Sequence, residues 1–151
     1  MSKQGRVEGI LSSRIKTEGE DSTATIIKTI SGSRFRDQVK MVALNGVALA
    51  GLNVVDLERL RSSGYDYVVL TRNRQRPSLL IKAIRIRKGR NSLQERLVVE
   101  HAKSEQRKVG GFYVRSSIPV PKGMISEIFE SLRLSHMISN GISTGESKGR
   151  I

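Results

Sequence analysis

The sequence contains no cysteine and no tryptophan among its 151 residues. Without cysteine, the chain can form no disulfide framework, no thiolate zinc site and no cysteine nucleophile, and this fits a reducing compartment. No apolar run approaches the roughly 20 residues that a membrane-spanning helix needs. Met1 to Arg6 are polar, and no hydrophobic signal segment follows them. We therefore expect no membrane partner and a cytoplasmic location.

Acidic residues are scarce as well. Only 14 Asp and Glu stand against 27 Lys and Arg, which gives a net charge of +13. A strongly basic chain favours a polyanionic partner, and nucleic acid comes first among these; the alternative is a basic protein from a basic proteome. Aromatic residues make up 4% of the chain, too few for a base-stacking surface. We therefore expect DNA or RNA as the partner, bound through its phosphates.

Hydrophobic periodicity predicts one α/β domain over residues 1–151, ending in a Gly/Ser-rich basic tail at about 143–151. Two apolar runs, at 39–44 and 67–70, flank a short helical stretch. This strand–helix–strand pattern predicts a parallel pair of strands with a right-handed crossover. The other expected elements are strands at 6–17 and 112–114, and helices at about 22–31, from Pro77 onward, at 92–103, at 124–132 and at 134–142.

The strongest functional signal is a basic segment between Arg72 and Arg90, with eight positive residues and no acidic one. Several of these cations lie within a Debye length of one another, and bound phosphates would relieve their repulsion. The alternative is a solvated helix face. The residues of this segment that we expect to hold phosphates are Arg72, Arg74, Arg76, Arg85, Arg87 and Lys88.

Candidates for metal binding are few. Asn45 follows the first parallel strand, where open α/β sheets bind ligands, but Asn-Gly is also an ordinary turn. Glu18 and Asp21 belong to an acidic stretch that could hold Mg²⁺ or could cap the helix that follows. His101 and His136 have no partner at ligand spacing, so we expect both to be structural.

Five stretches of the chain carry a further signal, at 18–23, 33–38, 44–56, 134–142 and 145–150. The most specific of them contain Gly-Leu-Asn-Val-Val-Asp and Gly-Glu-Ser-Lys-Gly-Arg. Together they resemble the archaeal DUF99 (UPF0215) family, relatives of endonuclease V with an RNase H-like fold. The resemblance covers nearly the whole chain.

The resemblance implies an RNase H-like mixed sheet with flanking helices and a Mg²⁺-dependent nuclease ancestry, in which carboxylates at strand ends hold the metal. This sequence departs from the family pattern twice. No Gly-Ile-Asp-Asp-like motif precedes Gly5, and Asn45 stands where the family typically has Asp. We therefore expect an N-terminally truncated member that lacks the first strands. Residues 6–17 must then pair with 39–44, or another chain must supply a strand, so an exposed sheet edge favours a homo-oligomer.

These observations favour a nucleic-acid-binding member of the family with impaired or no nuclease activity. Its phosphate ligands would be the basic segment together with Arg34, Arg36, Lys148 and Arg150. The first alternative is an active Mg²⁺-dependent endonuclease on deaminated-base DNA, with a site made of Glu18, Asp21, Asn45 and Asp56. In that case Glu18 and Asp21 are the metal ligands. The second alternative is a non-catalytic structural relic that binds nothing specific.

Overall fold

A four-stranded mixed sheet forms the centre of the computed structural model, which describes residues 7–144 and the side chains of residues 7–140. The strand order is β1 (Met41–Leu44), β4 (Asp66–Thr71), β6 (Phe112–Ser116) and β5 (Arg107–Val109). β1 and β4 run parallel, whereas β6 runs antiparallel to both β4 and β5. The α/β class with a mixed sheet, expected from the sequence, is confirmed.

The predicted strand–helix–strand unit over residues 39–71 is also confirmed. β1 leads through α2 (Leu57–Ser62) to β4, and the parallel register pairs Met41 with Asp66 and Leu44 with Val69. A small hairpin that the sequence did not predict, β2 (Ala48–Leu49) with β3 (Asn53–Val54), is inserted between β1 and α2.

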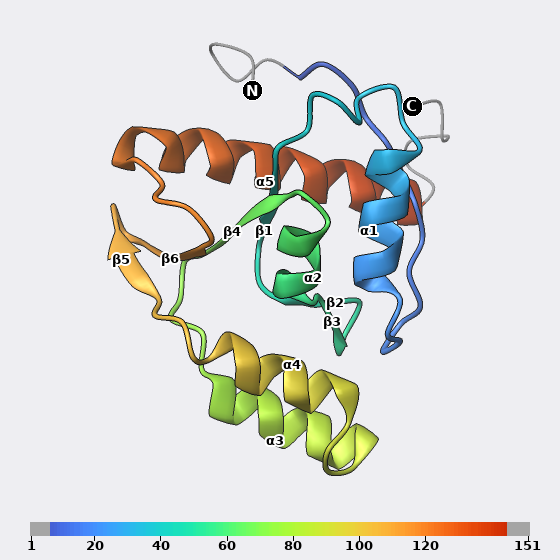
Figure 1. The fold of residues 1–151 in the computed structure, drawn as a ribbon, viewed down its shortest axis with the longest axis vertical. Helices are drawn as coiled ribbons and strands as arrows, with labels where there is room; N and C mark the ends of the chain where they lie inside the picture. Colours follow the sequence, from blue (N-terminus) through green and yellow to red (C-terminus); the bar gives the residue numbers. More distant parts are fainter. Residues whose placement is uncertain (1–6, 145–151) are drawn as a thin grey trace.

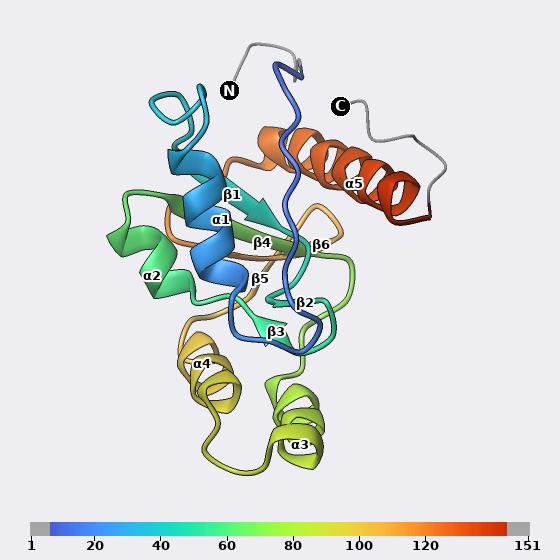
Figure 2. The ribbon, with the colours of Figure 1, turned by 90° about the vertical axis from the view of Figure 1, so that its right-hand side faces the viewer.

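The side chains of β4 alternate between two apolar cores, as the period of two in a strand requires. Tyr67 and Val69 belong to the core under α2 and α1 (Ser22–Ser31), whereas Val68 and Leu70 belong to the core under α5. α5 (Lys122–Thr144) is one continuous helix where the sequence predicted two segments. Figures 1 and 2 show α5 on one face of the sheet and α1 with α2 on the other. None of the helices within residues 7–144 combines the length and apolarity that crossing a bilayer requires.

A helical hairpin extends from the end of the sheet at which β4 finishes (Figures 1 and 2). It consists of α3 (Pro77–Lys88) and α4 (Leu93–His101), both of which the sequence predicted. Pro77 occupies the first turn of α3, where its missing N–H costs nothing. Ile84 of α3 and Val98 of α4 are buried in the core that contains α2, so the hairpin is anchored to the body of the domain.

The predicted strand at 6–17 is wrong. Residues 7–17 form no sheet ladder, and Val7, Ile10 and Leu11 are exposed. The segment lies against α1 and the loop after it instead: Gly9 packs onto the Phe35 ring, and Thr29 Oγ1 donates to Ser13 Oγ at 3.0 Å. The expected pairing of this segment with 39–44 is therefore wrong as well, and β1 has a strand neighbour on one side only.

Candidate nucleic-acid interface

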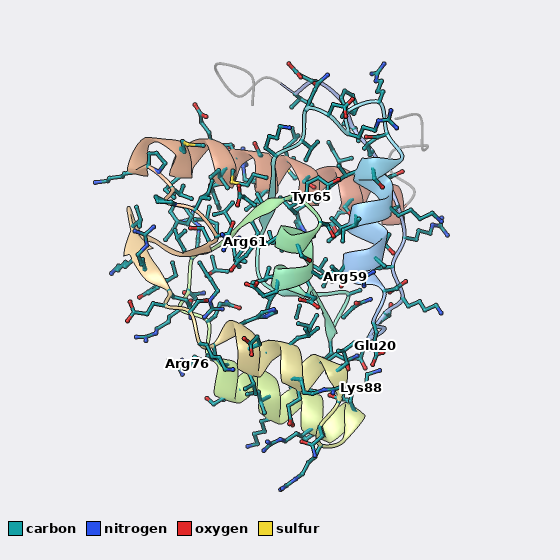
Figure 3. All side chains as sticks on the ribbon, in the orientation of Figure 1. Glu20, Arg59, Arg61, Tyr65, Arg76 and Lys88 are labelled. Carbon is teal, nitrogen blue, oxygen red and sulfur yellow. The ribbon has the colours of Figure 1, made fainter. Side chains whose placement is uncertain are left out.

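The basic segment begins where β4 ends and continues along α3. All eight of its cationic side chains are exposed. Figure 3 shows Arg76 and Lys88 at the two ends of the helix. The segment thus lies at the carboxyl end of the parallel strand pair, the edge at which open α/β sheets bind ligands.

α3 forms despite its dense positive charge because one face is apolar and the charges sit at its favourable end. Ile84 is fully buried, and Leu80, Ile81 and Ala83 pack against the same core. The last turn carries three basic residues, which interact favourably with the partial negative charge at a helix C-terminus. The apolar face fixes the helix on the domain, so its polar face points outward.

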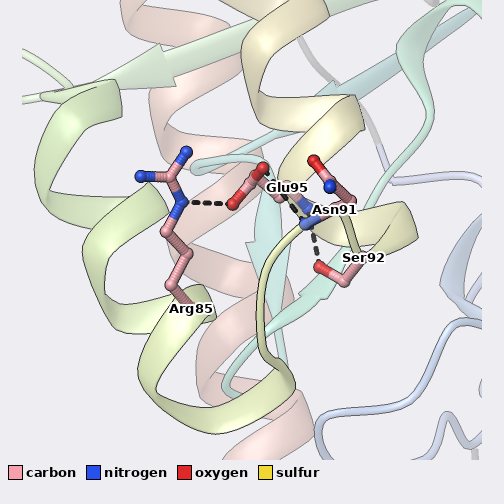
Figure 4. Close-up of polar contacts among 4 residues, drawn as sticks. All are labelled: Arg85, Asn91, Ser92 and Glu95. Carbon is pink, nitrogen blue, oxygen red and sulfur yellow. Dashed lines mark hydrogen bonds and ion pairs between the residues drawn. The ribbon is translucent and has the colours of Figure 1, made fainter.

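Two of the eight cations are neutralised by ion pairs. Arg85 donates through Nε to Glu95 of α4, a carboxylate that is 5% exposed (Figure 4). Glu95 also accepts from the Asn91 N–H at 3.3 Å, and its own N–H is bound by Ser92 Oγ at 3.2 Å. The hydrogen bond from Arg85 lowers the pKa of Glu95, so the pair ties α3 to α4. Arg87 forms the second ion pair, with Glu18.

The other six cations form no ion pair with a carboxylate within the described part of the chain. The Arg72 guanidinium lies over the rings of Phe112 and Phe129, 5.2 and 4.6 Å from their centroids. The remaining five have neither an ion pair nor a ring contact in the described residues, although Arg90 contributes to lowering the pKa of Glu95: Arg74, Arg76, Lys82, Lys88 and Arg90. This group, here called the free basic set, extends from the loop before α3 to the turn after it, with Lys82 and Lys88 on the helix itself.

An open groove of about 330 Å³ runs along the exposed side of α3. Lys82 and Arg90 line it together with the Ser78 hydroxyl and the apolar side chain of Ile86, which is 77% exposed. The groove therefore combines cations, a hydroxyl donor and an apolar surface. These groups match the charged and uncharged parts of a sugar–phosphate backbone.

The other predicted phosphate ligands lie elsewhere. Arg34 and Arg36 belong to the loop after α1, at the end of the molecule opposite to α3 in Figures 1 and 2. Arg34 stacks over the Phe35 ring at 4.8 Å, and Arg36 pairs with Asp37 at 3.9 Å. The structure thus does not join them to the basic segment. Lys148 and Arg150 lie outside the described residues.

Asp21, a predicted metal or capping residue, has a different role. Its carboxylate makes no cap bond to α1 but accepts from the Asn53 amide at 2.7 Å and from the Lys16 N–H at 3.1 Å. The Asn53 hydrogen bond is the main cause that lowers the pKa of Asp21. Asn53 itself is fully buried, and it also accepts from the Ser22 N–H. Asp21 therefore fastens the loop before α1 to the β2–β3 hairpin.

The sequence analysis did not single out Asn53, although it included the stretch in which this residue lies. Its signal is a single amide inside the apolar stretch from Leu52 to Val55. A buried polar side chain needs partners, and such a residue marks a place where distant segments meet.

The other candidate metal ligands already have protein partners or lie elsewhere in the fold. Glu18 has a φ of 55°, packs against Gly51 and pairs with Arg87. Asp56 caps α2, accepting from the Arg59 N–H at 3.1 Å, and Asn45 is exposed just after β1. Among residues 7–144 there is no group of three or more His, Asp or Glu side chains that could hold a metal. The side chains that the resemblance points to thus do not fit a Mg²⁺ site.

The two histidines differ in environment. His101, at the end of α4, is 6% exposed, and its Nε2 accepts from the Leu57 N–H at 3.5 Å. Burial, together with the neighbouring Arg115, lowers the pKa of His101 to about 4. His136 lies on the exposed side of α5, where its Nε2 contacts the Asn140 amide. Asp56 and Glu100 act on His101 in the opposite direction and partly offset the lowering of its pKa.

Comparison with known proteins agrees with the resemblance found in the sequence. The family model described as Endonuclease dU matches residues 1–143. A UPF0215 protein of Archaeoglobus fulgidus is 31% identical, over 97% of this chain and 84% of the relative. A UPF0215 protein of Thermococcus kodakarensis is 34% identical, over 94% of this chain and 77% of the relative.

A solved structure shares the fold. The crystal structure of a protein of unknown function from Archaeoglobus fulgidus superposes with a TM-score of 0.78 and 28% identity. The match covers 91% of this chain and 84% of that one. Sequence and fold lead to the same conclusion: the chain belongs to the Endonuclease dU family, whose archaeal relatives include UPF0215 proteins.

Proposed function

We propose that this protein binds DNA or RNA through the phosphate backbone and has impaired or no nuclease activity. The observation that carries the proposal is the free basic set, five exposed cations without a carboxylate partner in the described structure. Neighbouring cations of the set repel one another, and phosphates that replace small counterions relieve the repulsion while releasing those ions.

The geometry of α3 supports backbone contacts over base reading. Lys82 and Lys88 lie on α3, and Lys82 and Arg90 line the open groove beside it, where they can contact successive phosphates. No aromatic residue lines this groove. Sequence-independent binding by charge is therefore the expected mode, with little preference among bases.

The acidic loop supports the second half of the proposal. Each carboxylate of the candidate site already has a protein partner: Asn53 and the Lys16 N–H for Asp21, Arg87 for Glu18, and the Arg59 N–H for Asp56. Asn45 brings no charge to the end of β1. A divalent cation needs several oxygen ligands, usually with carboxylates among them, and these side chains would have to leave their partners to supply them.

An active Mg²⁺-dependent endonuclease on deaminated-base DNA is the alternative. The family description favours it, since it names an endonuclease. In this reading Glu18, Asp21, Asn45 and Asp56 would form the site. A structural role without any specific ligand is the remaining alternative, and it predicts neither binding nor cleavage.

Salt-dependent binding tests the proposal. If all five members of the free basic set contact phosphates, log K against log salt has a slope of about −4.5 for duplex DNA and about −3.5 for single strands. Duplex affinity then falls about 500-fold between roughly 50 and 200 mM salt. Fluorescence anisotropy with a labelled short duplex measures both quantities.

Single substitutions assign the contacts. Lys82→Gln and Arg90→Gln should each make the slope shallower by about 1. Arg61→Gln is the matched control, because Arg61 is an exposed cation on α2, apart from α3 (Figure 3). Equal losses in all three variants would refute the assignment to α3, since they would reflect net charge alone.

A further inference from the structure

The groove beside α3 follows one side of that helix. Its lining begins at Ser78 and recurs at helical spacing as far as Gly89, a length of about 16 Å, and Arg90 completes it in the turn after the helix. Its volume of about 330 Å³ lies at the lower end of the roughly 300–1,000 Å³ typical of small-ligand sites. Among the described residues, no acidic side chain lines it. The groove thus has room for a ligand of about the size of a nucleotide and no carboxylate in its lining to repel a phosphate.

The side chains between the cations of the groove are partly apolar. Ile86 is 77% exposed, more than any other large apolar side chain in the described part of the chain. Ile81 lines the same groove and also packs against the core, so its position is fixed. A single exposed apolar residue is ordinary at a protein surface, but these two share one groove with Lys82 and Arg90. A ligand with an apolar face between two negative charges would cover them.

Arg85 adds a planar surface to the groove. Its Nε donates to Glu95, which holds the guanidinium in place and balances its charge (Figure 4). The Nη groups of Arg85 form no hydrogen bond within the described residues, and 47% of the side chain remains exposed. A guanidinium plane is a surface on which unstacked nucleobases lie flat. Arg85 therefore suits contact with a base better than contact with a phosphate.

We propose that the groove holds an unpaired nucleotide of single-stranded DNA or RNA, with its base against Ile86 and Arg85 and its neighbouring phosphates at Lys82 and Arg90. In a duplex the bases are paired and stacked, so a duplex offers the groove only its sugars and phosphates. The apolar surfaces accept the face of any base, so the sequence of the strand has little effect. This binding mode rests on the proposed function and narrows its ligand to single strands.

Salt dependence separates the base contact from the phosphate contacts. Counterion release makes log K fall linearly with log salt, and its contribution vanishes on extrapolation to 1 M salt. The slope therefore reports the phosphate contacts, and the extrapolated value reports all other contacts. Per phosphate contact, a duplex releases more counterions than a single strand, about 0.9 against 0.7. A preference for single strands at 1 M salt thus cannot arise from charge.

Fluorescence anisotropy with three labelled ligands of equal length tests the base contact. The ligands are a DNA single strand, the same strand made of abasic nucleotides, and the duplex. We expect the affinity extrapolated to 1 M salt to be about 5-fold higher for the normal strand than for either other ligand, the lower end of what stacking of one base contributes. Equal extrapolated affinities with steep slopes would overturn the base contact and leave the proposed function intact. Slopes near zero for all three ligands would refute the proposed function and this binding mode with it.

A substitution in the groove assigns the contact. Ile86→Ala should lower the extrapolated affinity for the normal strand about 3-fold and leave its slope and the binding of the abasic strand unchanged. Val99→Ala is the matched control, because Val99 is an exposed aliphatic residue of α4 outside the groove lining. Equal affinities of the two variants for the normal strand would overturn the assignment to the groove.

Nuclear magnetic resonance of isoleucine methyl groups gives a direct readout on the wild-type protein. A base that lies against Ile86 shifts its δ1 methyl signal upfield through the ring current, whereas the abasic strand should not. The signal of Ile118 should stay in place, since Ile118 is also exposed but follows β6 at the opposite end of the sheet from α3. An RNA strand of the same sequence, titrated beside the DNA, shows which of the two gives the tighter complex. If neither strand shifts the Ile86 signal, the proposal is overturned.

Discussion

Replacing Asn53 by Ala should destabilise the protein far more than its place in a two-residue strand suggests. The Asn53 amide is fully buried and makes three hydrogen bonds. It donates to the Lys16 carbonyl at 2.8 Å and to Asp21 Oδ1 at 2.7 Å, and it accepts from the Ser22 N–H at 3.1 Å. One side chain thereby joins the acidic loop, the start of α1 and β3.

The expected loss follows from which partners water can reach. Ser22 is fully buried, so its N–H would stay unsatisfied, at a cost of about 1–3 kcal/mol. The cavity left by the amide adds about 1 kcal/mol. Lys16 is exposed, and water can replace its lost bond. The total of about 3 kcal/mol corresponds to a Tm lower by about 6–12 °C for a chain of this size.

Urea denaturation followed by circular dichroism at pH 7 measures this loss. Asn45→Ala is the matched control, since Asn45 is exposed and the structure gives its side chain no hydrogen bond. The control should stay within about 0.5 kcal/mol of the wild type. The pKa of Asp21 should rise in Asn53→Ala, because its main lowering contact is gone. If Asn53→Ala costs no more than Asn45→Ala, the described network does not hold the loop.

Three further predictions concern pH, backbone strain and assembly. Burial lowers the pKa of His101 from 6.5 to about 4. The free energy of unfolding should therefore be unaffected by this group above pH 6.5 and should fall by about 3 kcal/mol as the pH drops to 4. His101→Phe should flatten this part of a plot of the urea midpoint against pH. Gly51→Ala should cost about 1–2 kcal/mol more than Gly64→Ala in the same assay, since both have positive φ but only at Gly51 would a Cβ lie 3.0 Å from Glu18; equal losses would contradict this. The unpaired edge of β1 predicts self-association, so sedimentation should show a dimer that grows with concentration, and β1 amide exchange should slow with it; a monomer at all concentrations would exclude this.

The parts of the fold that sequence could predict are those fixed by local pattern. The run from Tyr67 to Leu70 predicted a buried strand because apolar side chains on both faces require cover on both faces, and α2 and α5 supply it. Pro77 and Ser92 marked the starts of two helices for equally local reasons. The strand predicted at 6–17 from its alternating apolar residues was wrong. Alternation shows that one face of a segment is apolar, but it does not show whether the edge of a sheet is available for pairing.

The parts of the site that sequence could not predict depend on distant contacts. The sequence suggested a metal-binding or capping role for Asp21. In the structure its carboxylate accepts a hydrogen bond from Asn53, 32 residues away. Arg34 was expected to hold phosphates together with the basic segment, but the loop after α1 to which it belongs lies at the other end of the molecule (Figures 1 and 2). Arg115 gave no signal in the sequence, because only the fold buries it beside His101.

One sample tests the central claim, that the protein binds phosphates through α3 without metal-dependent cleavage. A labelled duplex with a single deoxyuridine is incubated with the protein and Mg²⁺ at several salt concentrations. Bound fraction and cleavage products are then measured together. We expect a slope of log K against log salt near −4.5 and no cleavage product. Cleavage that disappears in Asp21→Ala, or binding that does not change with salt, would contradict it.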